Sequence, residues 1–394
     1  MFFQKNVEIY KILQLVKYCY FFKNMLEFPT EGTMQRLKSI DIIRGLVILK
    51  LILGFHPGIA EHVPPILKHA HWEGCTISDL VFPAFSITMC MLIPYLVDSK
   101  IKKGFSSKEI FLYGLKKVIT LTVLGIFLNA FPTFNLSTVR IPGVLQRQGF
   151  LLFTGIIIYL LVKKLTKERK KQVLILISLA VLIMTISYAL IPSTDDLTLV
   201  KRVDSFAFGV HTNYEGWDSE GILSTFNSIS TALIAIVIGI FLKSEKSNKY
   251  KFAFLLISGI ILIVLGKSIS LYYPMVKRLW TPSFVLFSAG VFVTLYSVIL
   301  FIIDILGFDK FTSPVLLLSR HSLAIYFFNS ISSKVIAAIT FREIPVSEWF
   351  TEYFITRFVG PSLDFYIYAL IHVVFWIVVL KLYENYKHKR FKYE

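Results

Sequence analysis

The residues best suited to chemistry lie in one short segment. Half of the eight histidines fall within 16 residues, at His56, His62, His69 and His71. A neutral imidazole can take a proton from an attacking amine or hydroxyl near neutral pH, or can itself attack an electrophile. A metal site that combines these imidazoles with a nearby glutamate is a competing interpretation, although the spacing fits no usual zinc pattern. Solvated loop histidines are the structural alternative, which suits His62 and His71 best.

Asp79 follows this segment at the start of an apolar run. Ser or Thr before such a run can cap a helix, and acidic residues favour its first turn, so Asp79 together with Thr76 and Ser78 can be purely structural. A carboxylate can also orient a neighbouring imidazole for proton transfer. The sequence therefore leaves two roles open for Asp79, helix capping and support of a catalytic histidine.

A second kind of candidate combines aromatic rings with carboxylates. The longest polar segment, 192–221, is acidic and carries Phe206, Tyr214 and Trp217. Trp72 and Glu73 bring the same combination to the histidine segment. An acidic, aromatic loop suits a sugar or an amine, and Trp72 and Glu73 could stack on or bind a sugar. A solvated loop is the structural alternative for each of these residues.

Ionisable residues also lie inside apolar stretches, where they are costly and tend to mark function. Arg44 lies three residues after Asp41, so the two share a helix face and can pair. Lys50 would lie roughly 14 Å into the same stretch, and His372 is at similar depth in the last one. Arg320 lies near the inner end of another. Such cations would suit the phosphates of a donor, whereas structural ion pairs are the alternative.

The composition indicates what must position these groups. Of the 394 residues, 55% are hydrophobic, 17% are charged and 36 are Phe, and the mean hydropathy is +0.66. No soluble domain can bury that much apolar surface, so the chain is predicted to be a polytopic membrane protein. A disordered chain, a secreted disulfide scaffold and a nucleic-acid-binding domain are excluded as the main interpretation. The three cysteines form neither a disulfide framework nor a metal set.

Ten apolar stretches approach or reach the length of about 20 residues that a membrane-spanning helix needs. With the N-terminus placed inside, the inner loops hold 22 Lys and Arg in 61 residues and the outer loops hold 9 in 96. This asymmetry predicts an all-α protein of about ten transmembrane helices, with both termini cytoplasmic, in the cytoplasmic (inner) membrane. The stretches are 40–58, 76–97, 111–130, 143–162, 172–191, 222–242, 252–266, 282–304, 315–339 and 362–380.

Residues 1–33 differ from the rest. Their apolar run, 12–22, is interrupted by Lys17 and is too short to span a membrane. A basic amphipathic helix at the membrane surface is one interpretation, and a mis-assigned start, with translation beginning at Met34, is the other. The remaining residues, 34–394, are predicted to form one transmembrane domain.

Five blocks of sequence resemble, in the same order, motifs of the heparan-α-glucosaminide N-acetyltransferase family and its bacterial relatives. The family signatures are HAxWxGxTxxDLVFP, RIPGVLQR, EGLLST, LWTPSFVLF and NSLAIY, the last without its leading Asn here. The corresponding segments are 69–83, 140–147, 220–225, 279–286 and 321–326.

The resemblance implies a transmembrane acyltransferase that moves acetyl from cytosolic acetyl-CoA to an amine or hydroxyl of an extracytoplasmic amino sugar or glycan. His69 corresponds to the family's catalytic histidine, as general base or acyl-accepting nucleophile, with Asp79 in support. No metal is expected, and the partners are lipid, donor, acceptor and a second copy in a homodimer. We expect substrate contacts at His56, Trp72, Glu73, Arg140, Gln146 and Arg147, and donor phosphates at Arg44, Lys50 and Arg320.

Two departures bear on activity. Phe55 and His56 replace an Asn pair in the family's VNNPG-like block, and one of those Asn is linked to catalysis. His56 could donate a hydrogen bond in its place. We favour an active enzyme with a different acceptor. The alternatives are an inactive protein that binds acetyl-CoA and a multi-pass transporter, which the buried Lys50 and His372 would suit.

Overall fold

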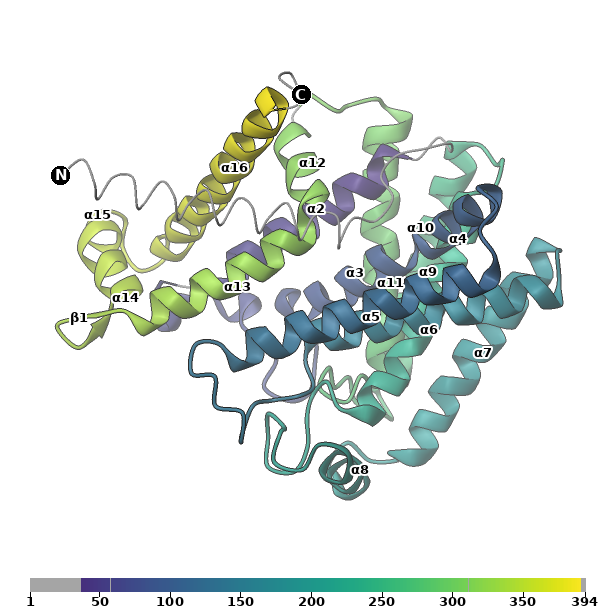
Figure 1. The fold of residues 1–394 in the computed structure, drawn as a ribbon, viewed down its shortest axis with the longest axis horizontal. Coiled ribbons are helices and arrows are strands. Elements are labelled where there is room, and N and C mark those ends of the chain that lie inside the picture. Colours follow the sequence, from purple (N-terminus) through teal and green to yellow (C-terminus); the bar gives the residue numbers. More distant parts are fainter. Residues whose placement is uncertain (1–36, 57, 311, 391–394) are drawn as a thin grey trace. The chain divides into compact units, whose positions relative to one another are not determined.

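The computed structural model describes residues 37–56, 58–310 and 312–390, and the two interpretations of residues 1–33 lie outside them. The regular structure of the described chain is helical except for one small hairpin, in which β1 (Thr340–Phe341) pairs antiparallel with β2 (Ile344–Pro345). Figure 1 shows the order of the elements. The helices are α2 (Lys38–Phe55), α3 (Ile77–Cys90), α4 (Ile93–Lys102), α5 (Ser107–Ala130), α6 (Val144–Leu165), α7 (Arg169–Leu190), α8 (Thr198–Phe208), α9 (Ile222–Leu242), α10 (Asn248–Ser270), α11 (Pro282–Leu300), α12 (Ser313–Arg320), α13 (Ser322–Ala338), α14 (Val346–Thr351), α15 (Arg357–Val359) and α16 (Asp364–Arg390).

Eight of the described helical segments are long and apolar enough to cross a membrane, which confirms an all-α membrane protein. They are Ile77–Lys102, Ser107–Ala130, Val144–Leu165, Arg169–Leu190, Ile222–Leu242, Asn248–Ser270, Pro282–Ile305 and Asp364–Tyr386. The two remaining predicted spans depart from this pattern. Helix α2 carries four charged residues, and the stretch 315–339 is divided at His321 into α12 and the 17-residue α13. The count of ten and the side of the termini stay predictions.

The described residues fall into two compact units. One contains 37–47 and 63–310, and we call it the large unit. The other contains 48–56, 58–62 and 312–390, and we call it the C-terminal unit. In the large unit, α3 and α9 are mostly buried, whereas α7 and α10 expose most of their side chains, including apolar ones such as Leu182 and Ile260. Because exposed apolar helix faces suit lipid, these two helices form lipid-facing parts of the unit.

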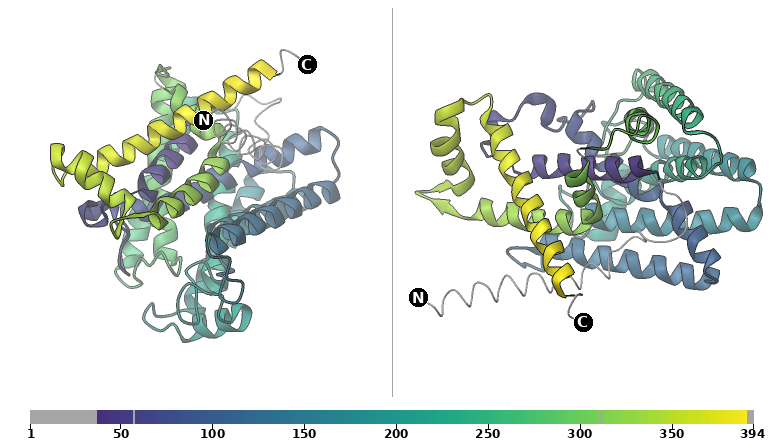
Figure 2. Two further views of the ribbon diagram at one scale, coloured as in Figure 1. Left: turned by 60° about the vertical axis from the view of Figure 1, so that its left-hand side comes forward. Right: turned by 90° about the horizontal axis from the view of Figure 1, so that it is seen from above.

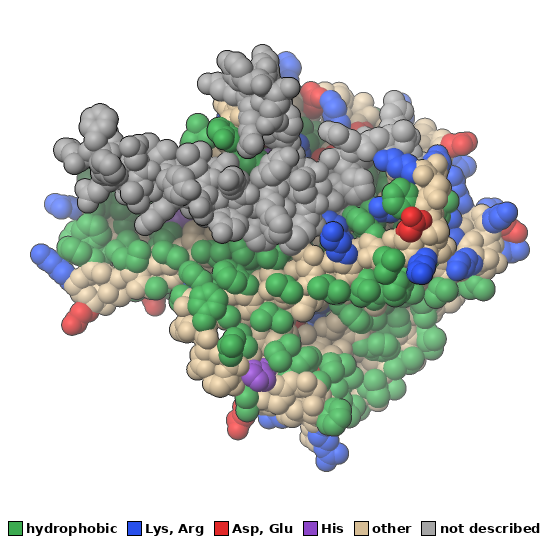
Figure 3. All heavy atoms as spheres, viewed as in Figure 1, with side chains coloured by type: hydrophobic (Ala, Val, Ile, Leu, Met, Phe, Trp, Pro, Cys, Tyr) green, Lys and Arg blue, Asp and Glu red, His purple; other side chains and the backbone are tan. Residues whose placement is uncertain are grey.

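Figure 3 shows how side-chain types are distributed over one face. Hydrophobic side chains cover much of it, and Lys and Arg gather at one side, over the ends of helices α4 to α7. On this face an apolar region is separate from a basic one, as in membrane proteins whose Lys and Arg collect at one side of the bilayer. At the ends of α6 and α9, Lys163 and Lys243 both pair with Asp98 of α4.

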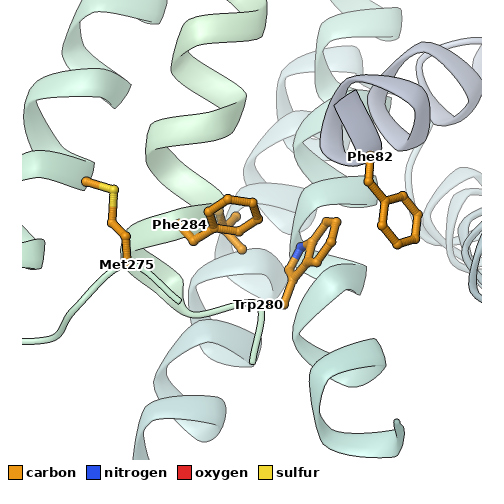
Figure 4. Close-up of a cluster of buried hydrophobic side chains, with 5 residues drawn as sticks. Phe82, Met275, Trp280 and Phe284 are labelled. Carbon is orange, nitrogen blue, oxygen red and sulfur yellow. The ribbon is translucent and has the colours of Figure 1, made fainter. Parts of the chain in front are cut away.

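A cluster of buried side chains fixes the start of α11. Trp280 lies between Phe82 of α3 and Phe284 of α11, with ring centroids 5.2 and 5.3 Å apart (Figure 4). Trp280 is fully buried and has a positive φ of 54°, which few non-glycine residues adopt. The packing therefore holds the loop between α10 and α11 in a tight turn against the first turns of α3, and this loop contributes to the site below.

In the C-terminal unit (Figure 2), the last residue of α2 contacts α13, and His56, the next residue, stacks on His372 of α16. The Ser333 hydroxyl donates to the Phe55 carbonyl, 2.8 Å away, which satisfies an otherwise unpaired group at the helix end. Asn329 is fully buried, and its Oδ1 accepts from the Trp376 indole at 2.7 Å. The amide oxygen of Asn329, inside an apolar helix bundle, thus has the Trp376 indole as a donor.

Candidate active site

The segment that carries His69 is tied down on both sides of that residue. Before it, the Ser78 hydroxyl donates to the carbonyl of Leu67, 2.5 Å away, in the short helical turn Pro65–Leu67. After it, the backbone N–H of Gly74 donates to the carbonyl of Met275, 2.8 Å away. These bonds connect the histidine segment to α3 and to the loop before α11, so three pieces of the large unit meet at one place.

His69 contacts Asp79 there, with Nδ1 2.8 Å from Oδ1. The other carboxylate oxygen, Oδ2, accepts from the backbone N–H of Ala70 and from the N–H and hydroxyl of Thr76, at 3.0, 3.0 and 2.9 Å. The Asp79 side chain is 2% exposed, whereas that of His69 is 62% exposed. Asp79 therefore forms the capping box of α3 and contacts the imidazole at the same time.

This geometry sets the chemistry that the imidazole can perform. A carboxylate accepts hydrogen bonds, so Nδ1 of His69 carries the proton and donates to Asp79. The lone pair is then on Nε2, the nitrogen that makes no contact with Asp79. An exposed imidazole with this tautomer can act as a base or as a nucleophile.

Lys277 is a third member of the cluster that the sequence did not single out. Its ammonium nitrogen lies 3.3 Å from Oδ1 of Asp79 and 3.2 Å from Nδ1 of His69. The one feature of the sequence that could have identified Lys277 is its position two residues before the LWTPSFVLF-like block. Because the ammonium donates to the same oxygen as the imidazole, it fixes the position of the carboxylate from the α11 side.

Burial affects Cys75, the next side chain along this loop. The thiol is half-buried, and burial together with the charge of Asp79 raises its pKa to about 12. It is therefore a neutral thiol at neutral pH and is not a nucleophile comparable with His69.

Three of the four aromatic residues predicted to suit a sugar come together next to this cluster, whereas Phe206 is almost fully exposed on α8. Trp72 and Trp217 meet edge to face at 6.0 Å, and Tyr214 stacks on Trp217 at 4.6 Å. The guanidinium of Arg278 lies 5.8 Å from the Trp72 ring centroid and 5.2 Å from that of Tyr214. Glu73 is exposed beside them. The two separate aromatic segments of the sequence thus form one surface.

Arg140 has partners inside the protein. Its Nε donates to Oδ2 of Asp218 at 2.8 Å, one terminal nitrogen donates to Oδ1 at 2.5 Å, and Glu220 contacts the same nitrogen. Burial alone would lower the pKa of Arg140, but the two carboxylates outweigh it and hold the pKa above its ordinary value. A substrate contact by Arg140 stays a prediction, since these bonds occupy most of its donors.

Arg147 and Gln146 lie deeper, on α6. Arg147 is buried and donates to the carbonyl of Ser219 and the hydroxyls of Ser224 and Thr225, at 2.6, 2.5 and 3.1 Å. Its guanidinium lies 4.9 Å from the centre of the Trp280 ring. The Gln146 amide donates to the carbonyl of Ile141 at 2.8 Å. The bonds of Arg147 connect α6 to the loop before α9 and to the first turn of α9. The predicted substrate contacts of both residues remain predictions.

The pairing of Asp218 with Arg140 gives a prediction about stability. Burial would raise the pKa of Asp218, but Arg140 and two backbone N–H groups outweigh it and lower the pKa. The carboxylate's contribution is therefore complete above its ordinary pKa of about 4 and is lost as the pH falls through the lower folded value. Asp218→Asn should destabilise the fold by about 3 kcal/mol at neutral pH, as expected for a buried charge that loses its partner.

This prediction is checked by thermal unfolding in detergent between about pH 7 and about pH 3. The difference in unfolding temperature between the variant and the wild type should become smaller as the pH falls. Asp195→Asn, which removes an exposed charge from the same polar segment, is the control and should change stability little. A difference in unfolding temperature that stays constant over this pH range would contradict the stabilising role of the Asp218–Arg140 pair.

The other predicted residues are divided between the units. Arg44 is a buried residue of α2 in the large unit, whereas Lys50, His56 and Arg320 belong to the C-terminal unit. His56 is buried, with Nε2 2.9 Å from Oδ1 of Asn329. Its ring stacks on that of His372, with centroids 3.8 Å apart. Arg320 pairs with Glu384 at 3.1 Å.

A second imidazole–carboxylate pair occurs in the C-terminal unit. Nδ1 of His62 lies 2.5 Å from Oδ2 of Asp364, and the Thr356 hydroxyl donates to the same oxygen at 2.6 Å. Asp364 is fully buried in the first turn of α16. No pattern in the sequence indicates this contact, since the two residues are 302 positions apart and a solvated loop is the simplest interpretation of His62.

Within the described residues, no group of three or more His, Cys, Asp or Glu side chains could hold a metal ion. Charged side chains also gather elsewhere, as where Arg140 meets Asp218 and Glu220. The His69–Asp79–Lys277 cluster differs in combining a largely exposed imidazole with a buried carboxylate.

Comparison with known proteins gives two similar relatives, and no family model matches the chain. The chain is 32% identical over 138 residues to human heparan-alpha-glucosaminide N-acetyltransferase, which covers 34% of this chain and 20% of the relative. It is 30% identical over 127 residues to the mouse protein of the same name, covering 31% and 19%. The matched region thus spans about a fifth of the length of these curated relatives.

Proposed function

We propose that the chain is a membrane acetyltransferase that moves acetyl from acetyl-CoA on the cytoplasmic side to an amine or hydroxyl of an amino sugar or glycan on the other side. The observation that carries the proposal is the pairing of the exposed His69 imidazole with the buried Asp79 carboxylate at 2.8 Å. The similarity to two proteins named as N-acetyltransferases supports the same reaction class. The membrane would be the cytoplasmic one.

In a direct transfer, the acceptor nitrogen or oxygen attacks the thioester carbon while Nε2 of His69 takes its proton. The C–S bond then breaks, and the imidazolium returns the proton to the departing thiolate. In a two-step transfer, Nε2 itself bonds to the acetyl carbon as the C–S bond breaks, and CoA leaves as a thiolate that takes a proton from water. The acceptor then attacks the acetyl carbon, the C–N bond to the imidazole breaks, and the acceptor's proton passes to water. In both routes Asp79 stabilises the positive charge that develops on the imidazole.

The remaining predicted residues receive roles within this proposal. Trp72 and Glu73, beside His69 in the chain, would bind the acceptor. Arg44 and Lys50 are the cations proposed for the donor's phosphates. Arg320, which has Glu384 as a partner, would have to exchange this ion pair for the donor.

The test uses purified protein in liposomes with acetyl-CoA labelled on the acetyl group, with and without glucosamine. We expect release of CoA thiol that depends on the acceptor, with the label on the sugar. Consumption of acetyl-CoA distinguishes this reaction from transport, in which a solute would cross the bilayer intact. If acetyl-CoA is bound but never consumed with any amino sugar or glycan tried, the chain is a binding protein and the proposal fails.

A further inference from the structure

Arg278 occupies an unusual position on the aromatic surface beside His69. Its guanidinium lies over the rings of both Trp72 and Tyr214, at 5.8 and 5.2 Å from their centroids. Tyr214 is stacked on Trp217, a buried residue of the cluster that holds the loop before α11. The arginine side chain is thus positioned by aromatic contacts on two sides, which reduces the conformational freedom lost when it binds a ligand.

The hydrogen-bonding capacity of this arginine is not used within the described part of the chain. No carboxylate, carbonyl or hydroxyl there accepts from Arg278, although Glu73 and Glu215 adjoin its aromatic partners in the sequence. Arg140 shows the contrast, because Asp218 and Glu220 occupy its guanidinium. A positioned guanidinium has five N–H donors in a planar fork, which matches the two oxygens of a carboxylate, sulfate or phosphate.

The chain places this group next to the proposed catalytic cluster. Arg278 directly follows Lys277, whose ammonium lies 3.2 Å from Nδ1 of His69. Trp72, which Arg278 covers, is three residues after His69 and is connected to the same loop by the Gly74–Met275 hydrogen bond. Arg278 therefore belongs to the same group of loops as His69, which an acceptor must reach.

We propose that Arg278 binds an anionic group of the acceptor and so selects an acidic amino sugar or glycan. The rings of Trp72 and Tyr214 hold the guanidinium in place, and the guanidinium would bind the carboxylate, sulfate or phosphate of the acceptor. This inference rests on the proposed function, since it names the substrate class for the same site. Arg278 would then determine substrate specificity, although it lies outside the five motif blocks.

The experiment compares Arg278→Gln with the wild type in neutral phosphatidylcholine liposomes, using glucosamine, glucosamine 6-phosphate and a disaccharide of glucosamine and a uronic acid. The wild type should prefer the two acidic acceptors. The variant should lose about tenfold or more in kcat/KM for them and change little with glucosamine, because charged hydrogen bonds are lost only with the anions. Arg202→Gln, which removes an exposed charge from α8, should leave all three values unchanged.

Other sources of the anion give different results. A higher KM for acetyl-CoA in Arg278→Gln, with unchanged acceptor values, would mean that the arginine binds donor phosphates and would overturn the proposal. A second outcome would also overturn the proposal. If phosphatidylglycerol in the liposomes changes the rate with glucosamine in the wild type but not in the variant, Arg278 binds a lipid headgroup. An equal loss with neutral and acidic acceptors would show a structural role and also contradict it.

Binding without acetyl-CoA separates this inference from the proposed function. Calorimetric titration of the wild type with glucosamine 6-phosphate should give an affinity that is about tenfold lower in Arg278→Gln. If the wild type acetylates none of the three sugars, the proposed function fails for these acceptors, but the difference in binding still supports anion recognition. Equal binding by both proteins would overturn the assignment of Arg278 whatever the activity.

Discussion

His69→Ala should lower the rate of acetyl-CoA-dependent transfer by about two to four orders of magnitude, the range associated with loss of a positioned general base. The variant lacks the nitrogen that takes the acceptor's proton, and no other group in the cluster can replace it. The Asp79 carboxylate is buried and surrounded by donors, and Lys277 is an ammonium group. Thiol release and transfer of label to the sugar are the measurements.

His71→Ala is the matched control, because it removes an exposed imidazole two residues away in the same loop. It should retain nearly full activity, and both variants should reach the membrane and unfold at about the wild-type temperature. Near-wild-type activity of His69→Ala would sink the assignment of the site. If the wild type also retains label on the protein before the acceptor is added, and His69→Ala does not, the two-step route is supported.

Hydropathy predicted the spans well because the bilayer imposes a physical length on each of them. A helix needs about 20 apolar residues to cross, and backbone groups in lipid must be paired internally, so the pattern is local. The stretch 315–339 shows the limit of this reasoning. Its hydropathy is continuous, but the helix is interrupted at His321, and that break depends on packing rather than on local composition.

The same distinction applies to the site. His69 and Asp79 are ten positions apart, on a tethered loop and the first helical turn after it, so their contact could be anticipated from local structure. Lys277 is 208 positions from His69, and no periodicity in the sequence relates the two. The motif blocks identified the segments that form the site. They did not identify the partner of each arginine, because Arg140 pairs with a carboxylate and Arg278 lies over an aromatic ring only in the folded chain.

Asp79→Asn should cause a loss of activity similar in size to that of His69→Ala, for a reason specific to the hydrogen bonds of this carboxylate. Oδ2 faces three donors, from Ala70 and Thr76, so the amide oxygen must take that place. The amide nitrogen then faces Nδ1 of His69 and requires it to accept. The imidazole proton moves to Nε2, and the lone pair needed for catalysis is lost.

Glu109→Gln provides the matched control for capping, since Glu109 completes the corresponding box with Ser106 at the start of α5. Both substitutions weaken a capping box, which is worth about 1 kcal/mol, but only the one at Asp79 should lower activity. Adding Asp79→Asn to His69→Ala should cause little further loss, because Asp79 acts through the imidazole. Independent, additive losses in the double variant would contradict this account and indicate that Asp79 contacts the substrate directly.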